Sequence, residues 1–248
     1  MTDLAGIEAV MCDVFGTVVD WRTGVAQQID ELLRARGVDL DGGLLADEWR
    51  ERYQPSMRAV NDGGRWRHLD DLHRESLDDL LAVHGVDDEV DDVTRAALVR
   101  TWHRLPAWPD STAGLRAIGE HCVVATLSNG GVALLTHLVK AARLPFDVIL
   151  SAELARRYKP DPAAYETAVG LLDLRPEQVL MVAAHQRDIE GARSVGMATA
   201  FVERPHEMGP HRSSERAADS DADVVVGDLR ELARRVRAAK GGDRYLDD

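Results

Sequence analysis

Short apolar runs that suit buried β-strands recur along this chain and alternate with segments of helical pattern. The runs that we expect to form strands are 7–12, 123–127, 146–150, 179–182, 199–202 and 222–226. Near-continuous apolar strands separated by helices are typical of a parallel sheet with both faces covered. The pattern therefore predicts an α/β fold whose core is a Rossmann-like parallel sheet.

One long helical segment interrupts this alternation directly after the first strand. It is rich in Leu, Ala, Arg, Asp and Glu, with leucines at helical spacing. Helix breakers divide it at Gly37, Gly42–Gly43, Pro55, Gly63–Gly64 and Gly85. We predict a helical cap over 20–105, inserted into a core formed by 1–19 and 106–240. The last residues, 241–248, are expected to form a flexible tail.

The charge balance limits the partners that this protein can bind. Its 248 residues include 30 Lys and Arg against 43 Asp and Glu, a formal net charge of −13. Nucleic acids and anionic membranes require a cationic face, so the acidic balance argues against both. No apolar run approaches the roughly 20 residues that span a bilayer. The N-terminal residues also lack the pattern of a signal peptide.

Only two cysteines occur, Cys12 and Cys122, and each lies in an apolar run. Buried thiols without a disulfide framework are typical of a reducing compartment, so we expect a cytoplasmic protein. The nine histidines are scattered without zinc-ligand spacing, and two cysteines do not supply a structural zinc site. These counts favour a protein that needs no metal and no other cofactor.

Polar groups stand where four of the predicted strands stop. In chain order they are Asp13, Ser128–Asn129, Lys159 and Asp188. In an open parallel sheet, ligands bind beyond the carboxyl ends of the strands. A single aspartate after a strand is more often a turn former or a helix N-cap. Four such strand ends at one edge of a sheet nevertheless indicate a common site.

The segments around these groups form four ordered motifs. They read Asp13-Val14-Phe15-Gly16-Thr17, Leu127-Ser128-Asn129-Gly130, Tyr158-Lys159-Pro160-Asp161 and a last segment that ends at Asp188. The set resembles the haloacid dehalogenase-like hydrolase superfamily and, within it, the L-2-haloacid dehalogenase (type II) family. The extension Val18-Val19-Asp20-Trp21-Arg22 is similar to the type II form. The resemblance covers nearly the whole chain, and four motifs in order are far more specific than one.

The resemblance implies covalent chemistry at these residues. Asp13 matches the nucleophile, and a carboxylate that forms an ester divides one difficult displacement into two easier steps. Lys159 would keep Asp13 ionised, because a nearby ammonium lowers a carboxylate pKa by roughly 1–3 units. Thr17 would donate a hydrogen bond within the Asp13 loop, or act only as a cap. Asp188 would activate the water that cleaves the ester, and Arg50 would attract the departing halide.

A second group of matched positions would bind the substrate. These residues are Val14, Phe15, Arg50, Ser128, Asn129, Tyr165 and His185. Side-chain and backbone donors near the second strand, with the start of the next helix, would hold the substrate carboxylate. Tyr165 would orient Arg50 or a carboxylate, unless it only packs its own helix. Arg50 has an alternative interpretation as a surface residue of a cap helix.

The fourth motif departs from the type II pattern at three positions. Where characterised members often carry Ser, Asn and Trp, this chain has Ala183, His185 and Arg187. His185 would be a hydrogen-bond partner near Asp188, or a base with a pKa near neutrality. Arg187 would close the pocket or face solvent.

Two apolar residues bear on the reaction class. Phosphatases of this superfamily carry a magnesium-binding Asp two residues after the nucleophile and another four residues before the position of Asp188. This chain has Phe15 and Ala184 at those places. Magnesium is held by oxygen ligands, which neither side chain offers. We therefore expect no metal, and Phe15 suits the apolar wall of a site for a carbon–halogen bond.

The expected function is hydrolytic dehalogenation of a short-chain 2-haloalkanoic acid to the 2-hydroxy acid through an aspartyl-ester intermediate. The partners would be this small anionic substrate and the halide product. Alternatives are a related hydrolase with another small substrate, a magnesium-dependent phosphatase, or a non-catalytic binding protein. Asp13, Lys159 and Asp188 together argue against the last alternative. Dimers are common in the family, so the resemblance leaves a homodimer open.

Overall fold

The computed structural model describes residues 4–241, where a parallel sheet of six strands forms the core. The strands are β1 (Ala9–Cys12), β2 (Val123–Ser128), β3 (Val148–Ser151), β4 (Val179–Ala183), β5 (Ala198–Val202) and β6 (Val224–Val226). Their order across the sheet is β3-β2-β1-β4-β5-β6, and every neighbouring pair runs parallel. The predicted α/β fold is confirmed, and each apolar run formed its expected strand with ends shifted by one or two residues.

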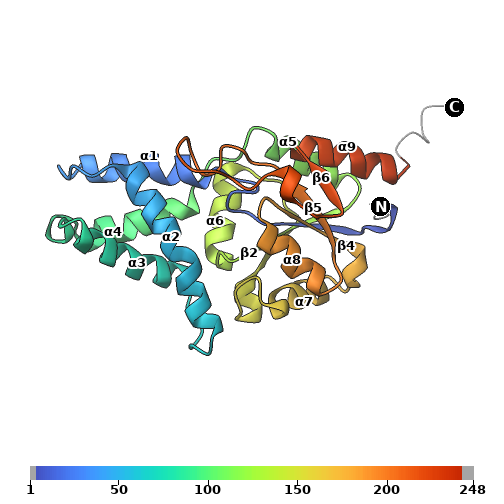
Figure 1. The fold of residues 1–248 in the computed structure, drawn as a ribbon, viewed down its shortest axis with the longest axis horizontal. Helices are drawn as coiled ribbons and strands as arrows, with labels where there is room; N and C mark the ends of the chain where they lie inside the picture. Colours follow the sequence, from blue (N-terminus) through green and yellow to red (C-terminus); the bar gives the residue numbers. More distant parts are fainter. Residues whose placement is uncertain (1–3, 242–248) are drawn as a thin grey trace.

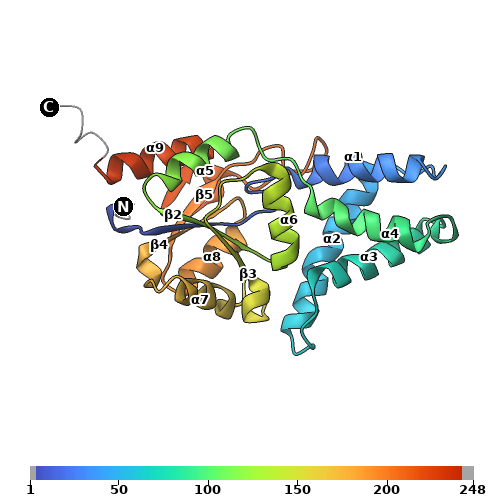
Figure 2. The ribbon, with the colours of Figure 1, turned by 180° about the vertical axis from the view of Figure 1, so that it is seen from behind.

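Helices cover both faces of the sheet, as Figures 1 and 2 show. The helices of the sheet layer are α5 (Ser111–Gly119), α6 (Val132–Ala142), α7 (Pro162–Leu171), α8 (Gln186–Ser194) and α9 (Leu229–Ala239). Alternate side chains of β1 divide between the two faces. Val10 and Cys12 pack in the cluster that holds α5, α6 and α9, while Ala9 and Met11 pack with α7 and α8. Covered faces explain why the strands are apolar throughout.

A second layer of helices lies beside the sheet layer (Figure 1). Its members are α1 (Trp21–Arg34), α2 (Gly42–Asn61), α3 (Leu69–Val83) and α4 (Asp92–Val99). The short 3-10 helix Arg100–His103 then leads back toward the sheet. The leucines of α3 expected to share an apolar face are buried. This helical layer follows β1 in the chain and places α2 over the edge of the sheet.

One of the predicted helix breaks in this layer is wrong. Pro55 lies inside α2, which runs unbroken from Gly42 to Asn61, whereas Gly42–Gly43 are the first residues of that helix, after the break that follows α1. Pro55 lacks the N–H for one helical hydrogen bond, but burial of the face that carries Trp49, Tyr53 and Met57 holds the helix together. Gly42 serves close packing, because a Cβ there would lie 2.4 Å from the carbonyl oxygen of Ala26 in α1.

Gly37, Gly63 and Gly85 do stand just beyond helix ends, and all three have positive φ.

The thiols of Cys12 and Cys122 are both buried, as expected from their apolar surroundings. Between residues 4 and 241, no helix has the length and apolar character needed to cross a bilayer. The tail expected over 241–248 lies, apart from Gly241, outside the described residues.

Candidate active site

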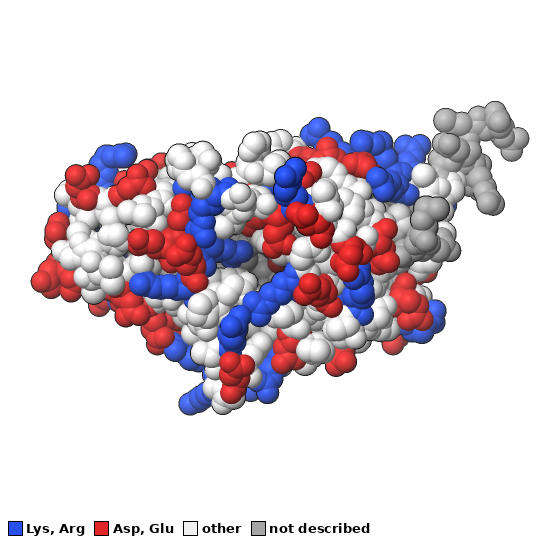
Figure 3. Space-filling view, in the orientation of Figure 1, with Lys and Arg blue, Asp and Glu red and all other residues white. Residues whose placement is uncertain are grey.

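The loops that follow the strands open into a cavity of about 260 Å³ between the sheet and α2. It is lined by Asp13, Phe15, Arg50, Tyr53, Gln54, Asn129, Lys159, Pro160, Tyr165, His185, Arg187, Asp188 and Glu215. In Figure 3 the surface between the two layers is hollowed, and basic side chains border the hollow. The cavity thus lies at the carboxyl edge of the sheet, where the strand-end pattern predicted a site.

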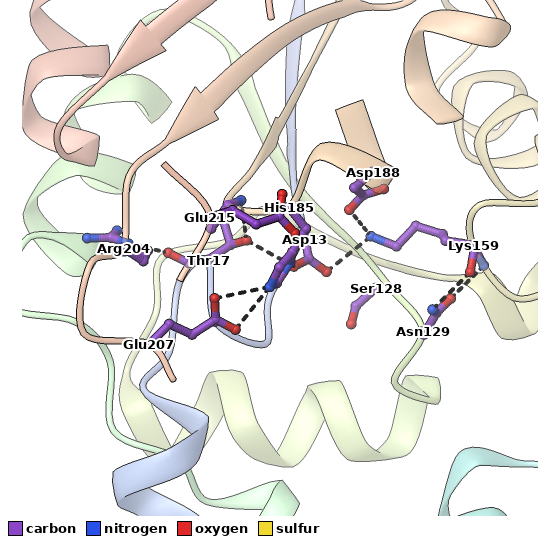
Figure 4. A network of polar contacts seen from close by, with 12 residues as sticks. Asp13, Thr17, Ser128, Asn129, Lys159, His185, Asp188, Arg204, Glu207 and Glu215 are labelled. Atoms are coloured by element: carbon purple, nitrogen blue, oxygen red, sulfur yellow. Dashed lines mark hydrogen bonds and ion pairs between the residues drawn. The ribbon is translucent and has the colours of Figure 1, made fainter. Parts of the chain in front are cut away.

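Asp13 stands directly after β1, and its two carboxylate oxygens contact different donors (Figure 4). Lys159 Nζ donates to Oδ1 at 3.1 Å, and the Thr17 hydroxyl donates to Oδ2 at 2.9 Å. Burial alone raises the pKa of this carboxyl. The charges of Lys159 and His185 outweigh burial and hold the pKa well below the ordinary range. Asp13 is therefore a buried carboxylate that stays ionised.

Lys159 lies between three acceptors at the ends of neighbouring strands. Its ammonium also donates to Asp188 Oδ2 at 2.5 Å and to the carbonyl oxygen of Leu127 at 2.7 Å. Burial lowers the pKa of Lys159, but the adjacent charges of Asp13 and Asp188 raise it overall. The Asn129 side chain fixes this loop, because its Oδ1 accepts from Lys159 N at 2.7 Å and its Nδ2 donates to Lys159 O at 3.3 Å.

Asp188 lies in the first turn of α8 and is itself buried. The Tyr165 hydroxyl donates to its Oδ1 at 2.5 Å, so Tyr165 orients a carboxylate, which was one of its two expected roles. Burial, together with the charge of Asp13, raises the pKa of Asp188 despite the opposing effect of Lys159. Gly191 makes room for this contact, since a Cβ there would lie 2.5 Å from the Tyr165 hydroxyl oxygen.

Thr17 links the Asp13 loop to the neighbouring strand end. Its hydroxyl accepts a hydrogen bond from Ala184 N at 2.9 Å while it donates to Asp13. Its carbonyl oxygen accepts from Arg204 Nε at 2.9 Å. The Arg204 guanidinium also forms a two-fold ion pair with Asp110, at 2.7 and 2.9 Å. The loop that carries the Asp13 carboxylate is therefore held from two sides.

Arg50 reaches the cavity from α2. Its guanidinium carbon lies 4.4 Å from the ring centre of Tyr53 and 5.1 Å from that of Trp21. Its Nη1 is buried, with no hydrogen-bond partner among the described residues. Arg50 is thus a cation on the cavity wall rather than a surface helix residue, and aromatic faces hold it in place.

His185 does not contact Asp188, contrary to one expectation. Its Nδ1 lies 3.5 Å from Asp13 Oδ2, and its Nε2 lies 2.9 and 3.1 Å from the two carboxylate oxygens of Glu207. Burial opposes the charged form, but Glu207 and Asp13 raise the pKa of His185 to about 10. The expectation of a base with a pKa near neutrality is therefore wrong. The ring faces two carboxylates, so its protonated form is stabilised.

Glu207 was missed at the level of sequence because it lies in a loop that reads as polar surface. The side chain is almost completely buried, and its Oε1 also accepts from Trp21 Nε1 at 3.0 Å. One signal could have found this loop. The predicted strand 199–202 ends at Glu203-Arg204, so the strand-end argument applies there as it does at Asp13.

Three of the expected site residues do not line the cavity: Val14, Thr17 and Ser128. Val14 is buried beside Asp13. The Ser128 hydroxyl oxygen accepts from Gly130 N at 3.2 Å, so it shapes the turn after β2. Phe15 forms an apolar wall, and its ring packs edge-on to Trp102 with 5.8 Å between ring centres. Arg187 is an exposed residue of the rim and donates to Gln54 Oε1 at 2.9 Å.

A family model for haloacid dehalogenase-like hydrolases matches residues 7–196 of this chain. The chain belongs to the haloacid dehalogenase-like hydrolase family. (S)-2-haloacid dehalogenase 1 of Pseudomonas sp. strain CBS-3 is 30% identical over 204 residues, which cover 80% of this chain and 85% of that protein.

Solved structures of this family superpose on nearly the whole fold. A defluorinating L-2-haloacid dehalogenase is 43% identical with a TM-score of 0.90, over 93% of this chain and 95% of that chain. The L-2-haloacid dehalogenase of Xanthobacter autotrophicus, solved with chloropropionic acid covalently bound, is 26% identical with a TM-score of 0.79. That match covers 93% of this chain and 98% of the other.

The magnesium ion of the phosphatases among haloacid dehalogenase-like hydrolases does not fit beside Asp13. Lys159 contacts one carboxylate oxygen, while Thr17 and His185 face the other. Phe15 and Ala184 supply no oxygen ligand. Within the described part of the chain, no three His, Cys, Asp or Glu side chains are grouped to hold a metal.

Proposed function

We propose that this protein hydrolyses a short-chain 2-haloalkanoic acid to the corresponding 2-hydroxy acid, with release of halide. One observation carries the proposal. The Asp13 carboxylate, kept ionised by Lys159, faces a cavity of about 260 Å³ whose wall also holds the partly buried cation Arg50. This arrangement suits displacement of a halide, because Asp13 can act as the nucleophile and Arg50 can bind the departing anion. The related dehalogenases named above support the same chemistry.

The first step would be an attack by Asp13 on carbon 2 of the substrate. A bond forms between a carboxylate oxygen and carbon 2, and the carbon–halogen bond breaks with its electron pair leaving on the halide. Arg50 stabilises the halide as its charge develops, so it binds the transition state better than the ground state. Phe15 supplies the apolar surface beside the reacting carbon.

The substrate carboxylate would bind at the turns after β1 and β2. Backbone N–H groups of Phe15 and Asn129, which both line the cavity, are the donors that we assign to it. Ser128 acts by holding the second turn through its contact with Gly130. Several placed donors explain how a protein with a net charge of −13 can bind a small anion.

The second step would be hydrolysis of the aspartyl ester. Asp188 takes a proton from a water molecule, which attacks the carboxyl carbon of Asp13. Its raised pKa makes it a stronger base than an ordinary aspartate, while Lys159 and Tyr165 fix its orientation. The products are the 2-hydroxy acid and the regenerated carboxylate of Asp13.

The helices α1–α4 would act as a cap domain over this site, since α2 carries Arg50, Tyr53 and Gln54 to the cavity. We further propose that the protein works in the cytoplasm, because its two cysteines are both buried thiols. A homodimer stays a prediction from the family resemblance.

Halide release tests this function directly. Chloroacetate and fluoroacetate are incubated with the protein in the presence of EDTA, and chloride or fluoride is measured. We expect release by the wild type and none by Asp13→Asn, whose amide is a poor nucleophile. Inactivity toward a panel of haloacids would overturn the proposal. Magnesium-dependent hydrolysis of p-nitrophenyl phosphate would favour the phosphatase, and an intact cellular role in Asp13→Ala would favour a binding protein.

A further inference from the structure

His185 lies between the carboxylates of Asp13 and Glu207, as Lys159 lies between those of Asp13 and Asp188. Its Nδ1 faces Asp13 Oδ2 at 3.5 Å, and its Nε2 faces both oxygens of Glu207 at 2.9 and 3.1 Å (Figure 4). About a quarter of the His185 side chain is exposed, whereas only 3% of the Glu207 side chain is. Glu207 therefore lies on the protein side of the ring, and His185 lies on the cavity side.

The position of Glu207 depends on several residues around it. Trp21 Nε1 donates to its Oε1 at 3.0 Å. Gly16, which has a φ of +86°, leaves the space it needs, since a Cβ there would lie 2.1 Å from Glu207 Oε1 and 3.1 Å from His185 Cε1. Arg204, three residues earlier, is fixed by its ion pair with Asp110. The surrounding residues thus hold the Glu207 carboxylate in contact with the His185 ring.

The geometry favours a doubly protonated ring. Carboxylate oxygens accept hydrogen bonds and carry negative charge, so a ring nitrogen that faces one is stabilised when it carries a hydrogen. A neutral imidazole has only one N–H and would leave a nitrogen lone pair facing a carboxylate. The imidazolium has two and fits both neighbours. The raised pKa of His185, about 10, agrees with this conclusion.

We propose that Glu207 is a positioning residue that keeps His185 as an imidazolium, and that His185 and Thr17 together form an oxyanion hole around Asp13 Oδ2. The inference rests on the proposed function. Thr17 Oγ1 already donates to Oδ2 at 2.9 Å, and His185 Nδ1 forms an ion pair with the same oxygen at 3.5 Å. Oδ1, on the Lys159 side, is then the oxygen that bonds to carbon 2 of the substrate.

These residues account for every proton and electron pair that moves during hydrolysis of the ester. Water attacks the ester carbon of Asp13, its proton moves to Asp188, and the carbonyl electrons move onto Oδ2 as a negative charge. His185 and Thr17 stabilise that charge. The tetrahedral intermediate then collapses, the bond from the ester carbon to Oδ1 breaks, and the alkoxide of the product takes the proton from Asp188. Asp13 retains the water oxygen, and the second proton of water leaves to solvent.

Charged groups on each neighbouring element bear on the protonation of His185. Asp13 faces it from the end of β1 and Glu207 from the loop after β5. Lys159 faces Asp13, and the charge of Arg50 on α2 acts on Glu207. Glu215 lines the same cavity, but its Oε2 accepts from Gln186 N and it does not contact the His185 ring. Glu207 is therefore the carboxylate to replace, and Glu215 is a matched control.

The first test measures the ring of His185 and needs no substrate. Nitrogen-15 NMR of the wild type at pH 8 should show both ring nitrogens protonated. Glu207→Gln keeps a polar group beside Trp21 but removes the negative charge, so the pKa of His185 should fall toward the ordinary value near 6.5. Glu215→Gln should leave the ring signals unchanged. A neutral His185 ring in the wild type at pH 8 would overturn the inference. This measurement does not depend on the folding of any variant.

The second test separates the two steps of the reaction. Glu207→Gln should release a first equivalent of halide as a burst and then turn over at least about tenfold more slowly at pH 8, because ester hydrolysis has lost a charged donor. Lowering the pH through the new pKa of His185 should restore hydrolysis. A pH profile equal to that of the wild type would contradict the oxyanion role. If the wild type releases no halide, the proposed function fails and the oxyanion role falls with it, while the ring signals still decide the protonation of His185.

Discussion

Lys159 Nζ lies 3.1 Å from Asp13 Oδ1 in a place where both side chains are buried. The same ammonium also contacts Asp188, so one cation lies between two carboxylates. The pKa of Asp13 is lowered, whereas the pKa of Asp188 is raised. Two buried carboxylates next to each other would otherwise favour protonation of one. In the proposed reaction, Lys159 would thus allow Asp13 to act as the nucleophile and Asp188 as the base.

Lys159→Met should remove this balance. We expect halide release to fall by at least about 10³-fold and the free energy of unfolding to drop by about 3–5 kcal/mol, because buried carboxylates are left without their cation. Halide assays and urea denaturation measure the two effects. Lys140→Met is the matched control, since Lys140 is exposed on α6 and should change both quantities little. Equal effects of the two substitutions would contradict the role of Lys159.

The acid limb of the pH–rate profile should report Asp188. Its pKa is raised, so activity is lost as the pH falls through that value, while Asp13 with its lowered pKa stays ionised. Tyr165→Phe removes a hydrogen bond that stabilises the Asp188 carboxylate, so the limb should move to higher pH. Tyr158→Phe is the control, because that hydroxyl donates to the carbonyl oxygen of Arg67 instead. An acid limb that stays in place in Tyr165→Phe would count against Asp188 as the base.

Arg50→Lys should slow halide departure. The guanidinium lies over Tyr53 and Trp21, and a lysine ammonium does not reproduce its planar donors. We expect kcat to fall by about 10²–10³-fold, as when one donor to a developing charge is lost. Arg58→Lys, on an exposed part of the same helix, is the control. Single-turnover halide release gives the rate, and an unchanged rate in Arg50→Lys would exclude Arg50 from that step.

Arg204→Met should lower stability rather than alter the chemistry directly. Its buried ion pair with Asp110 and its contact with the Thr17 carbonyl would be lost, at a cost of about 3–5 kcal/mol in the free energy of unfolding. The exposed pair between Arg193 and Asp221 provides the comparison. Arg193→Met should cost no more than about 1 kcal/mol. Similar costs for both variants, measured by urea denaturation, would show that burial of the pair does not matter.

Much of this fold could be predicted because apolar strands of a covered sheet are visible as continuous runs. The ends of these runs also predicted that Asp13, Asn129, Lys159 and Asp188 lie at the carboxyl edge of the sheet, and all four line one cavity there. Pro55 was misread because local propensity predicted a break, whereas burial of one face of α2 decided the outcome. Tertiary packing overrides propensity in such helices.

The partners of His185 could not be predicted from its neighbours in the sequence. Glu207 lies 22 residues away in a polar loop, and Trp21, which holds Glu207, lies 186 residues from it. Nothing in the local pattern distinguishes Glu207 from solvated acids such as Asp219. Only the return of the loop after β5 to the edge of the sheet brings its carboxylate to the ring, and that return also raises the pKa of His185.

A single turnover in water labelled with oxygen-18 tests the covalent role of Asp13 most directly. The protein, in excess over a 2-haloacid, is digested after one turnover, and the peptide that contains Asp13 is weighed by mass spectrometry. We predict one labelled oxygen in the Asp13 carboxylate and an unlabelled hydroxyl in the product, since the product oxygen comes from Asp13. Product that carries the label while Asp13 carries none would contradict the aspartyl ester.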